Sequence, residues 1–197
     1  MPRIVYIKES KGGGYVIVGI ADGEEKYALV VDKATYSSIA APPRGHEITN
    51  EEMTVMRAAD GEYRALKKAL SLLSYADNSK RNLKMKLLRA GFSSSSADEA
   101  IREVVRLGYL NEDEQLRRAI LYEVNSRLTG PMKLISKLSA KGYSVSLIRE
   151  AVGALSDEGL VDFDENRRVL IEKKLDPDAP PEQKQKLLKS YGYKYYD

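Results

Sequence analysis

The sequence contains no cysteine and only one histidine, His46, among its 197 residues. Without cysteine there is no disulfide and no thiol nucleophile, and a single histidine cannot form a histidine-based metal cluster. No run approaches about 18 apolar residues, the length that favours a membrane-spanning helix. The first ten residues also lack the apolar core of a secretory signal. We therefore expect a cytoplasmic protein with no membrane segment and no histidine-based metal cluster.

The net charge is only +3, but the charged residues are unevenly distributed along the chain. Residues 64–149 carry 17 basic and 8 acidic side chains, whereas residues 1–63 and 150–197 each have a net charge of −3. A basic middle between mildly acidic ends suggests a polyanion or an acidic protein surface as a partner. Ordinary solvated helix faces rich in lysine and arginine explain this distribution equally well.

The first 48 residues indicate a small β-rich domain. Residues 4–7, 15–20 and 26–31 are short runs of β-branched and aromatic side chains, and Asp22-Gly23 is a hairpin turn signal. The glycine run at 12–14 lacks the Lys-Ser/Thr that follows in a phosphate-binding loop, and it leads into a strand. A flexible hairpin tip is therefore the better interpretation of these glycines.

From Thr49 onward the sequence has helical signals. Thr49 and Glu52 form a potential capping box that starts a helix, and Asp60-Gly61 is a candidate interruption of it. Apolar residues then recur at helical spacing, at Leu66, Ala69, Leu70 and Leu73.

The next two helices also have recognisable ends. Asn78 or Ser79 can cap the N-terminus of the first, and Gly91 can end it in a left-handed conformation. Ser96 and Glu99 form a second candidate capping box for the helix that follows.

One segment of the sequence occurs twice. NLKMKLLRAGFS (82–93) returns as KLISKLSAKGYS (133–144). When residues 83–114 are shifted by 51 they overlay 134–165 without a gap, and 11 of the 32 pairs are identical. Most identities fall at expected core, cap or helix-ending glycine positions, which a repeated helical unit retains. A third copy starts near Asp164 and stops after its second helix.

This repeat predicts a mostly α-helical protein, in which tandem three-helix repeats form a curved, elongated array after the small β-rich N-terminal domain. We expect a β-rich domain (1–48), a helical linker (49–63), a first repeat (64–110), a second repeat (111–161) and a truncated third repeat of two helices (162–197). Such a body suits contact along another macromolecule better than enclosure of a small substrate.

Little in the sequence resembles a catalytic site. His46 lies in a Pro/Gly-rich loop, and the serines at 93–96 have no accompanying base, so helix capping explains them better. Acidic clusters at 112–114 and 162–165 lie at expected helix N-termini, and they lack the glycine and distal glutamate of a calcium loop. We therefore expect no enzymatic activity.

Basic side chains on the repeats form the main candidate site. In each middle helix, core leucines place lysine or arginine on the opposite face, and Lys133, Lys137 and Lys141 are expected to form an exposed stripe. The residues expected to bind a partner or DNA are Arg81, Lys84, Lys86, Arg89, Arg117, Arg118, Arg127, Lys133, Lys137 and Lys141. Ordinary surface lysines and arginines are the alternative.

Two further modes of nucleic-acid binding are weaker. A helix-turn-helix would place Asp98 and Glu99 in the first turn of its recognition helix, where they would meet phosphates unfavourably. The C-terminal tyrosines could stack on bases, and these are Tyr191, Tyr193, Tyr195 and Tyr196. Tyr193 aligns with Phe92 and Tyr143 just after a helix-ending glycine, which favours a packing role.

The motifs NSKRNLKMKLLRAGF, GYLNEDEQ and GPMKLISKLSAKGYS, in this order and spacing, resemble the repeats of the bacterial regulatory protein RecX family. The matching positions are Ser79, Leu83, Leu87, Gly91, Gly108, Tyr109, Leu110, Asn111, Gly130 and Pro131. The resemblance covers about residues 60–193, and the strand-rich N-terminus resembles an extension that some members carry. This chain departs from the family pattern at 80–82, which lack the usual acidic residue, and in its shortened last unit.

The resemblance implies a modulator of the RecA recombinase, which binds in the groove of the RecA–DNA filament and most often inhibits recombinase activity in DNA repair and the SOS response. It also implies single- or double-stranded DNA as a further partner, a monomer, and neither catalysis nor a cofactor. One alternative is a free-standing DNA-binding repeat protein that acts without RecA. Another is an unrelated helical adaptor.

Overall fold

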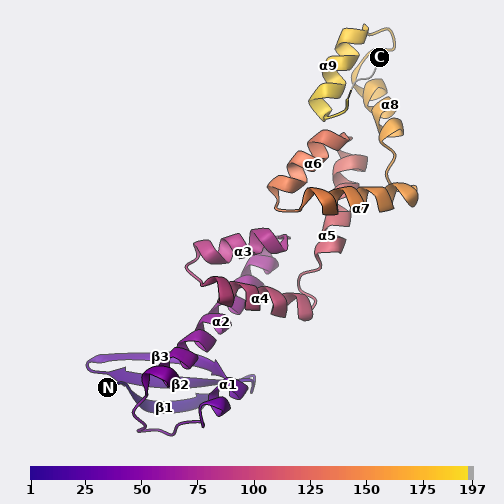
Figure 1. The fold of residues 1–197 in the computed structure, drawn as a ribbon. Coiled ribbons are helices and arrows are strands. Elements are labelled where there is room, and N and C mark those ends of the chain that lie inside the picture. The colour runs from indigo at the N-terminus through magenta and orange to yellow at the C-terminus, as the bar shows by residue number, and fades with distance from the viewer. Residues whose placement is uncertain (195–197) are drawn as a thin grey trace. The chain divides into compact units, whose positions relative to one another are not determined.

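The computed structural model describes residues 1–194 and consists of a small sheet followed by helices (Figure 1). The chain divides into two compact units. The first unit consists of Met1–Ala76 and Leu83–Tyr109, and the second consists of Asp77–Asn82 and the residues from Leu110 onward. The short segment Asp77–Asn82 therefore belongs with the second unit and not with its neighbours in sequence.

An antiparallel sheet opens the first unit. Its strands are β1 (Arg3–Glu9), β2 (Tyr15–Asp22) and β3 (Glu25–Asp32), in the order β1-β2-β3, so the three expected strands are confirmed. Asp22 pairs with Glu25, which leaves Gly23 and Glu24 as the turn, and Gly23 has a φ of 61°. A tight hairpin of this length needs such a positive φ, which explains the glycine.

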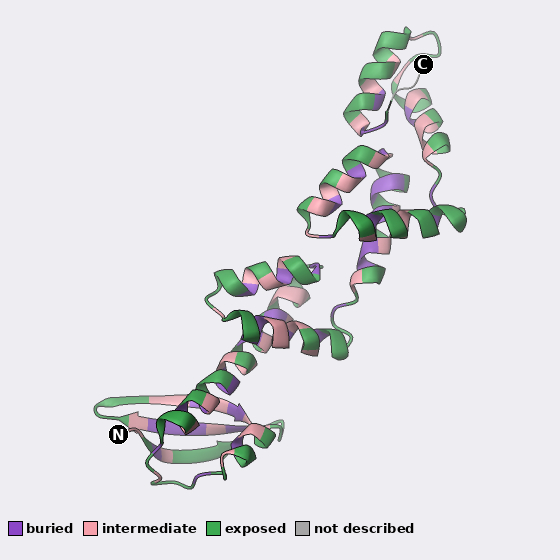
Figure 2. Ribbon diagram, viewed as in Figure 1, coloured by how far each residue is buried: buried purple, intermediate pink, exposed green. Residues whose placement is uncertain are grey.

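One face of the sheet is covered by helices. The short helix α1 (Lys33–Ser38), which the sequence did not predict, begins where Asp32 Oδ1 accepts a hydrogen bond from Thr35 N–H. The N-terminal half of α2 (Asn50–Tyr75) packs beside it against β3. The resulting core contains Ile4, Val18, Ile20, Val31, Ile48 and Met56, all nearly inaccessible to solvent (Figure 2).

Helix α2 runs unbroken through 26 residues, so the interruption expected at Asp60-Gly61 was wrong. Its predicted N-terminal capping box is confirmed. Asp60 is buried, and its Oδ1 accepts a hydrogen bond from Val30 N–H at 2.9 Å. A Cβ at Gly61 would lie 3.2 Å from Ser96 Oγ of the facing helix. These two residues therefore serve contacts with β3 and α4 and not a helix end.

Helices α3 (Lys80–Arg89) and α4 (Ser94–Arg106) follow. Ser79 Oγ accepts a hydrogen bond from Asn82 N–H, so Ser79 caps α3. Helix α4 is capped by Ser93, which accepts from Ser96 N–H, and the predicted Ser96–Glu99 box was wrong. Ser96 is instead buried, because α4 packs there against α2.

The second unit repeats this pattern with α5 (Glu112–Leu121), α6 (Pro131–Ala140) and α7 (Val145–Asp157). Asn111, Gly130 and Ser144 are the N-caps, and Pro131 occupies the first turn of α6. A five-residue π-helix, η1 (Tyr122–Ser126), extends α5 and was not predicted. The buried core is formed by Leu116, Ile120, Val124, Leu134, Leu138, Ile148 and Leu155.

The third copy consists of α8 (Phe163–Lys174) and α9 (Pro181–Tyr191). Leu170, Leu188 and Tyr193 form its buried centre. The predicted combination of mostly helical structure with a small N-terminal sheet is confirmed. Between residues 1 and 194, no helix has the length and apolar character needed to cross a membrane.

A repeated end-to-end contact links the middle helices. Ser79 Oγ, at the start of α3, donates a hydrogen bond to the carbonyl oxygen of Lys141, at the end of α6 (2.8 Å). Gly130 N–H, at the start of α6, donates to the carbonyl oxygen of Tyr191, at the end of α9 (2.7 Å). Lys141 and Tyr191 each precede a glycine with positive φ, so the corresponding carbonyl accepts in both contacts. We call these two contacts the helix seams.

Glycines allow the close approach at the seams. A Cβ at Gly142 would lie 2.5 Å from Ser79 Oγ, and one at Gly192 would lie 2.5 Å from the backbone nitrogen of Lys133. A Cβ at Gly130 would lie 2.6 Å from the carbonyl carbon of Gly192. These distances are too short for real Cβ atoms, so the repeated glycines follow from the seams as well as from helix termination.

Candidate interaction surfaces

The ten basic residues predicted from the sequence divide between the two units. Lys84, Lys86 and Arg89 lie in the first unit, and the other seven lie in the second. Many of these side chains have partners within the chain. The partners determine how much of each charge is available to another molecule.

On α3, Lys84 is engaged by α4. Lys84 Nζ lies 2.6 Å from Asp98 Oδ1, and the hydrogen bond from Lys84 lowers the pKa of the Asp98 carboxyl. Lys86 is half-buried, whereas Arg89 is exposed in the last turn. Arg89 is therefore the most accessible of the three cations predicted in this unit.

Both predicted arginines of α5 form ion pairs. Arg117 makes a bidentate pair with Glu158 at the end of α7, with Nη1 2.9 Å from Oε1. This hydrogen bonding raises the pKa of Arg117 and lowers that of Glu158. Arg118 lies 3.3 Å from Glu114 and 3.5 Å from Asp77. Part of the charge of both arginines is therefore used within the second unit.

Lys137 neutralises a buried carboxylate. Glu123, in η1, exposes 8% of its side chain and accepts hydrogen bonds from Lys137 Nζ (2.5 Å) and Thr129 Oγ1 (3.0 Å), with Arg127 at 4.0 Å. Burial opposes ionisation of Glu123, but the hydrogen bonds from Lys137 and Thr129 outweigh it, so its pKa is lowered. Lys137 is a half-buried counter-ion, and its placement in an exposed stripe was wrong.

Lys133 lies at a helix seam. Its Nζ donates a hydrogen bond to the carbonyl oxygen of Ser190 at 2.9 Å and lies 5.6 Å from the centroid of the Tyr191 ring. A cation is favourable at this position because the C-terminus of α9 carries partial negative charge. Arg81 and Lys141 are exposed, and neither forms an ion pair with another described residue. Their charges are therefore available to a partner.

Two hollows in the second unit gather basic side chains. The first hollow, of about 680 Å³, has the basic lining residues Arg127, Lys133, Lys137, Lys173 and Lys174. The second hollow, of about 670 Å³, has Lys133, Lys189 and Lys194. No acidic residue is found among the described residues that line either hollow. Lys133 lines both, so the hollows adjoin one another at this side chain.

The sequence did not single out Lys173, Lys174 or Lys189. They lie in the third copy, within a segment whose net charge is −3, so averaging over the segment conceals them. The signal that could have revealed them is their position in the last turns of α8 and α9. Two successive basic residues at a helix end, such as Lys173 and Lys174, form a local cluster that the net charge of the whole segment does not reveal.

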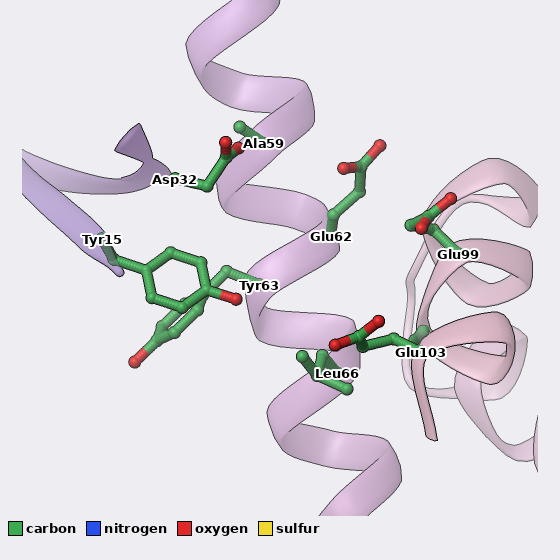
Figure 3. Close-up of a pocket in the computed structure, with 9 residues that line it drawn as sticks. Tyr15, Asp32, Ala59, Glu62, Tyr63, Leu66, Glu99 and Glu103 are labelled. Atoms are coloured by element: carbon green, nitrogen blue, oxygen red, sulfur yellow. The ribbon is translucent and has the colours of Figure 1, made fainter. Parts of the chain in front are cut away.

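An acidic recess lies in the first unit (Figure 3). It is lined by Tyr15, Asp32, Glu62, Tyr63, Glu99 and Glu103, among others, and the two tyrosine rings have centroids 4.7 Å apart. Burial, and then the charges of Glu99 and Asp32, raise the pKa of Glu62. Within residues 1–194 no group of three or more His, Cys, Asp or Glu side chains is placed to hold a metal ion. The recess therefore concentrates negative charge without forming a candidate metal centre.

The histidine and the C-terminal tyrosines also have defined places. His46 Nε2 lies 3.0 Å from Glu52 Oε1, next to the capping box of α2. Tyr193 is buried with its ring centroid 6.5 Å from that of Phe163, and burial raises its pKa to about 12. The packing role predicted for Tyr193 is confirmed, whereas Tyr195 and Tyr196 lie outside the described residues.

Comparison with known proteins gives consistent relatives, although no protein-family profile matches the chain. Regulatory protein RecX of Lactobacillus gasseri is 28% identical over 162 residues, which cover 82% of this chain and 58% of the relative. Regulatory protein RecX of Lactobacillus johnsonii is 27% identical, with 80% and 57% covered. That of Clostridioides difficile is 28% identical, with 78% and 72% covered. The chain thus spans somewhat more than half the length of the two Lactobacillus relatives.

Solved structures show the same fold. A crystal structure of regulatory protein RecX has a TM-score of 0.69 and 18% identity, and the match covers 98% of this chain and 95% of that one. RecX from Lactobacillus salivarius has a TM-score of 0.56 and 21% identity, with 70% and 91% covered. This chain therefore resembles the proteins called regulatory protein RecX in its sequence over about four-fifths of its length, and it shares the fold of their solved structures.

Proposed function

We propose that this chain regulates the RecA recombinase by binding in the groove of the RecA–DNA filament, and that it restrains recombinase activity in DNA repair and the SOS response. The observation that carries the proposal is the similarity, over about four-fifths of the chain, to proteins called regulatory protein RecX. Repeated helical units with basic middle helices suit contact along an extended partner. The protein would act as a cytoplasmic monomer, by binding and without catalysis.

The predicted basic residues are expected to contribute unequally to this contact. Arg81, Arg89 and Lys141 are exposed, and none forms an ion pair with another described residue. They can therefore contact a partner without breaking an ion pair within the chain. Lys84 and Lys137 are already paired with carboxylates of the chain. We therefore propose that Arg81, Arg89 and Lys141 lead the contact, with Arg117, Arg118, Arg127, Lys133 and Lys86 in support.

Titration of the protein into RecA that is hydrolysing ATP on single-stranded DNA tests the function. Inhibition is expected at protein concentrations well below those that coat the DNA, because a regulator of the filament acts on RecA and does not have to cover the strand. The DNA occupancy is measured in parallel at the same salt concentration. Inhibition that appears only when the DNA is saturated would contradict the proposal.

A charge-reversal variant tests the contact surface. Arg81→Glu/Arg89→Glu/Lys141→Glu is expected to raise the concentration for half-inhibition about tenfold or more, because like charges replace complementary ones. The matched control Lys11→Glu/Lys26→Glu/Lys68→Glu changes net charge equally at exposed positions. Equal losses in both variants would show that overall charge, and not these three residues, determines inhibition.

A free-standing DNA-binding protein is the second candidate function. The observation that favours it is the pair of basic hollows, which no acidic residue lines among the described residues. The titration distinguishes the two candidates by the concentration at which inhibition appears. A protein that only binds DNA inhibits RecA by covering the strand, so its inhibition appears only when the DNA is saturated.

A further inference from the structure

We propose that a strip of exposed apolar side chains on α3 and α4 docks against an acidic protein surface, and that in the RecA–DNA filament this surface belongs to RecA and not to the DNA. The apolar strip consists of Met85, Leu88 and Val105, and none of them belongs to the predicted contact set. The inference rests on the proposed function for the identity of the partner, and it names the component of the filament that the first repeat contacts.

Folding of the repeat does not require apolar side chains at these positions. Met85 is 43% exposed, Leu88 is 37% exposed and Val105 is 38% exposed. The second copy has serine at all three positions that align with the strip at the offset of 51. These serines are Ser136, Ser139 and Ser156. The same three-helix pattern therefore forms with hydroxyl groups there, and the apolar side chains of the first copy are available to another molecule.

The strip runs across two helices that lie side by side (Figure 1). Lys84 Nζ of α3 lies 2.6 Å from Asp98 Oδ1 of α4, and this ion pair joins the faces that carry the two residues. Leu88 follows Lys84 by one helical turn on α3. Ile101, which is half-buried, and Val105 follow Asp98 by one and two turns on α4. Apolar groups therefore extend from both sides of the ion pair as one surface and are not scattered singly.

The charges of α3 favour an acidic partner. Its ten residues include five cations and no carboxylate. These cations are Lys80, Arg81, Lys84, Lys86 and Arg89. Arg89, which adjoins Leu88, is exposed and forms no ion pair with another described residue. A planar guanidinium suits bidentate pairing with a carboxylate, so the complementary surface places carboxylates beside apolar side chains.

The combination of these charges with aliphatic groups favours protein over nucleic acid. A phosphodiester backbone has no apolar surface to cover the strip, and the bases of a single strand stack on aromatic rings, which the strip lacks. Methionine and arginine, by contrast, are enriched in protein interfaces. Covering Leu88 and Val105 with apolar side chains of a partner removes hydrocarbon from water, and this contribution needs no ions.

A lipid surface fits the strip less well. The affinity of an amphipathic helix for a bilayer grows with the apolar area that it can insert. The largest apolar side chains of α3 besides the strip are Leu83 and Leu87, and both are fully buried in the first unit. The narrow strip that remains suits a shaped protein surface and not a bilayer.

Binding of the full chain to RecA filaments on immobilised oligo-dT, measured by biolayer interferometry, tests the proposal. Leu88→Ser/Val105→Ser is expected to weaken binding about tenfold, because the apolar area that the partner covers is reduced. Adding Met85→Ser is expected to weaken it further. The tenfold difference should persist between about 0.1 M and 0.5 M salt, since salt screens charges but not apolar contacts. Binding to oligo-dT without RecA is expected to stay unchanged.

The matched control is Val145→Ser/Leu160→Ser, which removes the same two residue types from exposed positions in the second unit, and it is expected to bind the filament as the wild type does. Equal losses in both double variants would overturn the proposal. Loss of oligo-dT binding in Leu88→Ser/Val105→Ser would assign the strip to nucleic acid, and loss of binding to phosphatidylglycerol vesicles would assign it to a membrane.

Thermal melts check folding, and Leu88→Asn/Val105→Thr replaces the serine variant if that variant unfolds. Failure of the inference and failure of the proposed function give different results. If the wild type binds the filament and the serine variant binds it equally well, only the strip is wrong. If the wild type binds oligo-dT but gains nothing from RecA, the proposed function is wrong as well.

Discussion

Gly192→Ala is expected to lower the free energy of unfolding of the second unit by about 2–5 kcal/mol. Two costs add: a left-handed conformation at a residue with a Cβ, about 1–2 kcal/mol, and overpacking, about 1–3 kcal/mol. Gly192 has a φ of 88°, and its new Cβ would meet the backbone nitrogen of Lys133 at 2.5 Å. The atom opposite is backbone, so the clash cannot be relieved by rotating a side chain. Urea unfolding followed by circular dichroism measures the loss.

Gly159→Ala separates the two costs. Gly159 has a φ of 71° at the end of α7, but a Cβ there would have no neighbour within 4 Å. This variant is therefore expected to show the conformational cost alone, about 1–2 kcal/mol. If Gly192→Ala were no more destabilising than Gly159→Ala, the seam between α6 and α9 would be looser than the structure shows.

Lys137→Met is expected to destabilise the protein by about 2–3 kcal/mol at neutral pH. Removing one partner of a buried ion pair commonly costs about 3–5 kcal/mol, because the other charge is left in a poorly solvating site. The smaller figure applies here because 31% of the Lys137 side chain is exposed and Arg127 remains 4.0 Å from Glu123. Thermal and urea unfolding of the wild type and variant measure the difference.

The loss should depend on pH. In the wild type the pKa of Glu123 is below its ordinary value, so this group stabilises the fold at neutral pH and the contribution is lost as pH falls through the folded-state pKa. In the variant, burial dominates and favours the protonated acid. The difference between the two proteins should therefore shrink in acid, where Glu123 is protonated in both.

Two further variants test whether the loss of stability in Lys137→Met comes from the unpaired charge of Glu123. Glu123→Gln/Lys137→Met is expected to recover part of the stability at neutral pH, because no buried charge is left without a partner. Arg168→Met removes an exposed ion pair with Glu165 and is expected to have little effect. A pH-independent loss in Lys137→Met would show that the aliphatic contacts of Lys137, and not its charge, stabilise η1.

The sequence predicted those features of the fold that depend on local chemistry. Thr49 and Ser79 cap helices in the structure as expected, because a side-chain oxygen and an amide three residues later form the whole interaction. Local chemistry also gave a wrong prediction at Asp60-Gly61, because this residue pair is common in turns but lies inside α2 here. The reason is tertiary, since Asp60 accepts from Val30 in β3.

The candidate site was less predictable for the same reason. Helical spacing predicted an exposed Lys137, but it lies beside the core leucines, and no local rule identifies Glu123 as its partner across the η1–α6 connection. The run of four serines at the start of α4 offered several N-caps, and the packing of Ser96 against α2 left Ser93 in that role. Which lysines keep an available charge is decided by such non-local contacts.

The helix seams have an electrostatic consequence. At each seam the partial negative charge at the C-terminus of one helix meets the partial positive charge at an N-terminus, because Tyr191 of α9 accepts from Gly130 and Lys141 after α6 accepts from Ser79. The hydrogen bonds at the seams come from a backbone amide and a serine hydroxyl, and no ionised side chain is needed for them. These polar junctions are therefore independent of the charged side chains on the surrounding helix faces, so a change of surface charge leaves them in place.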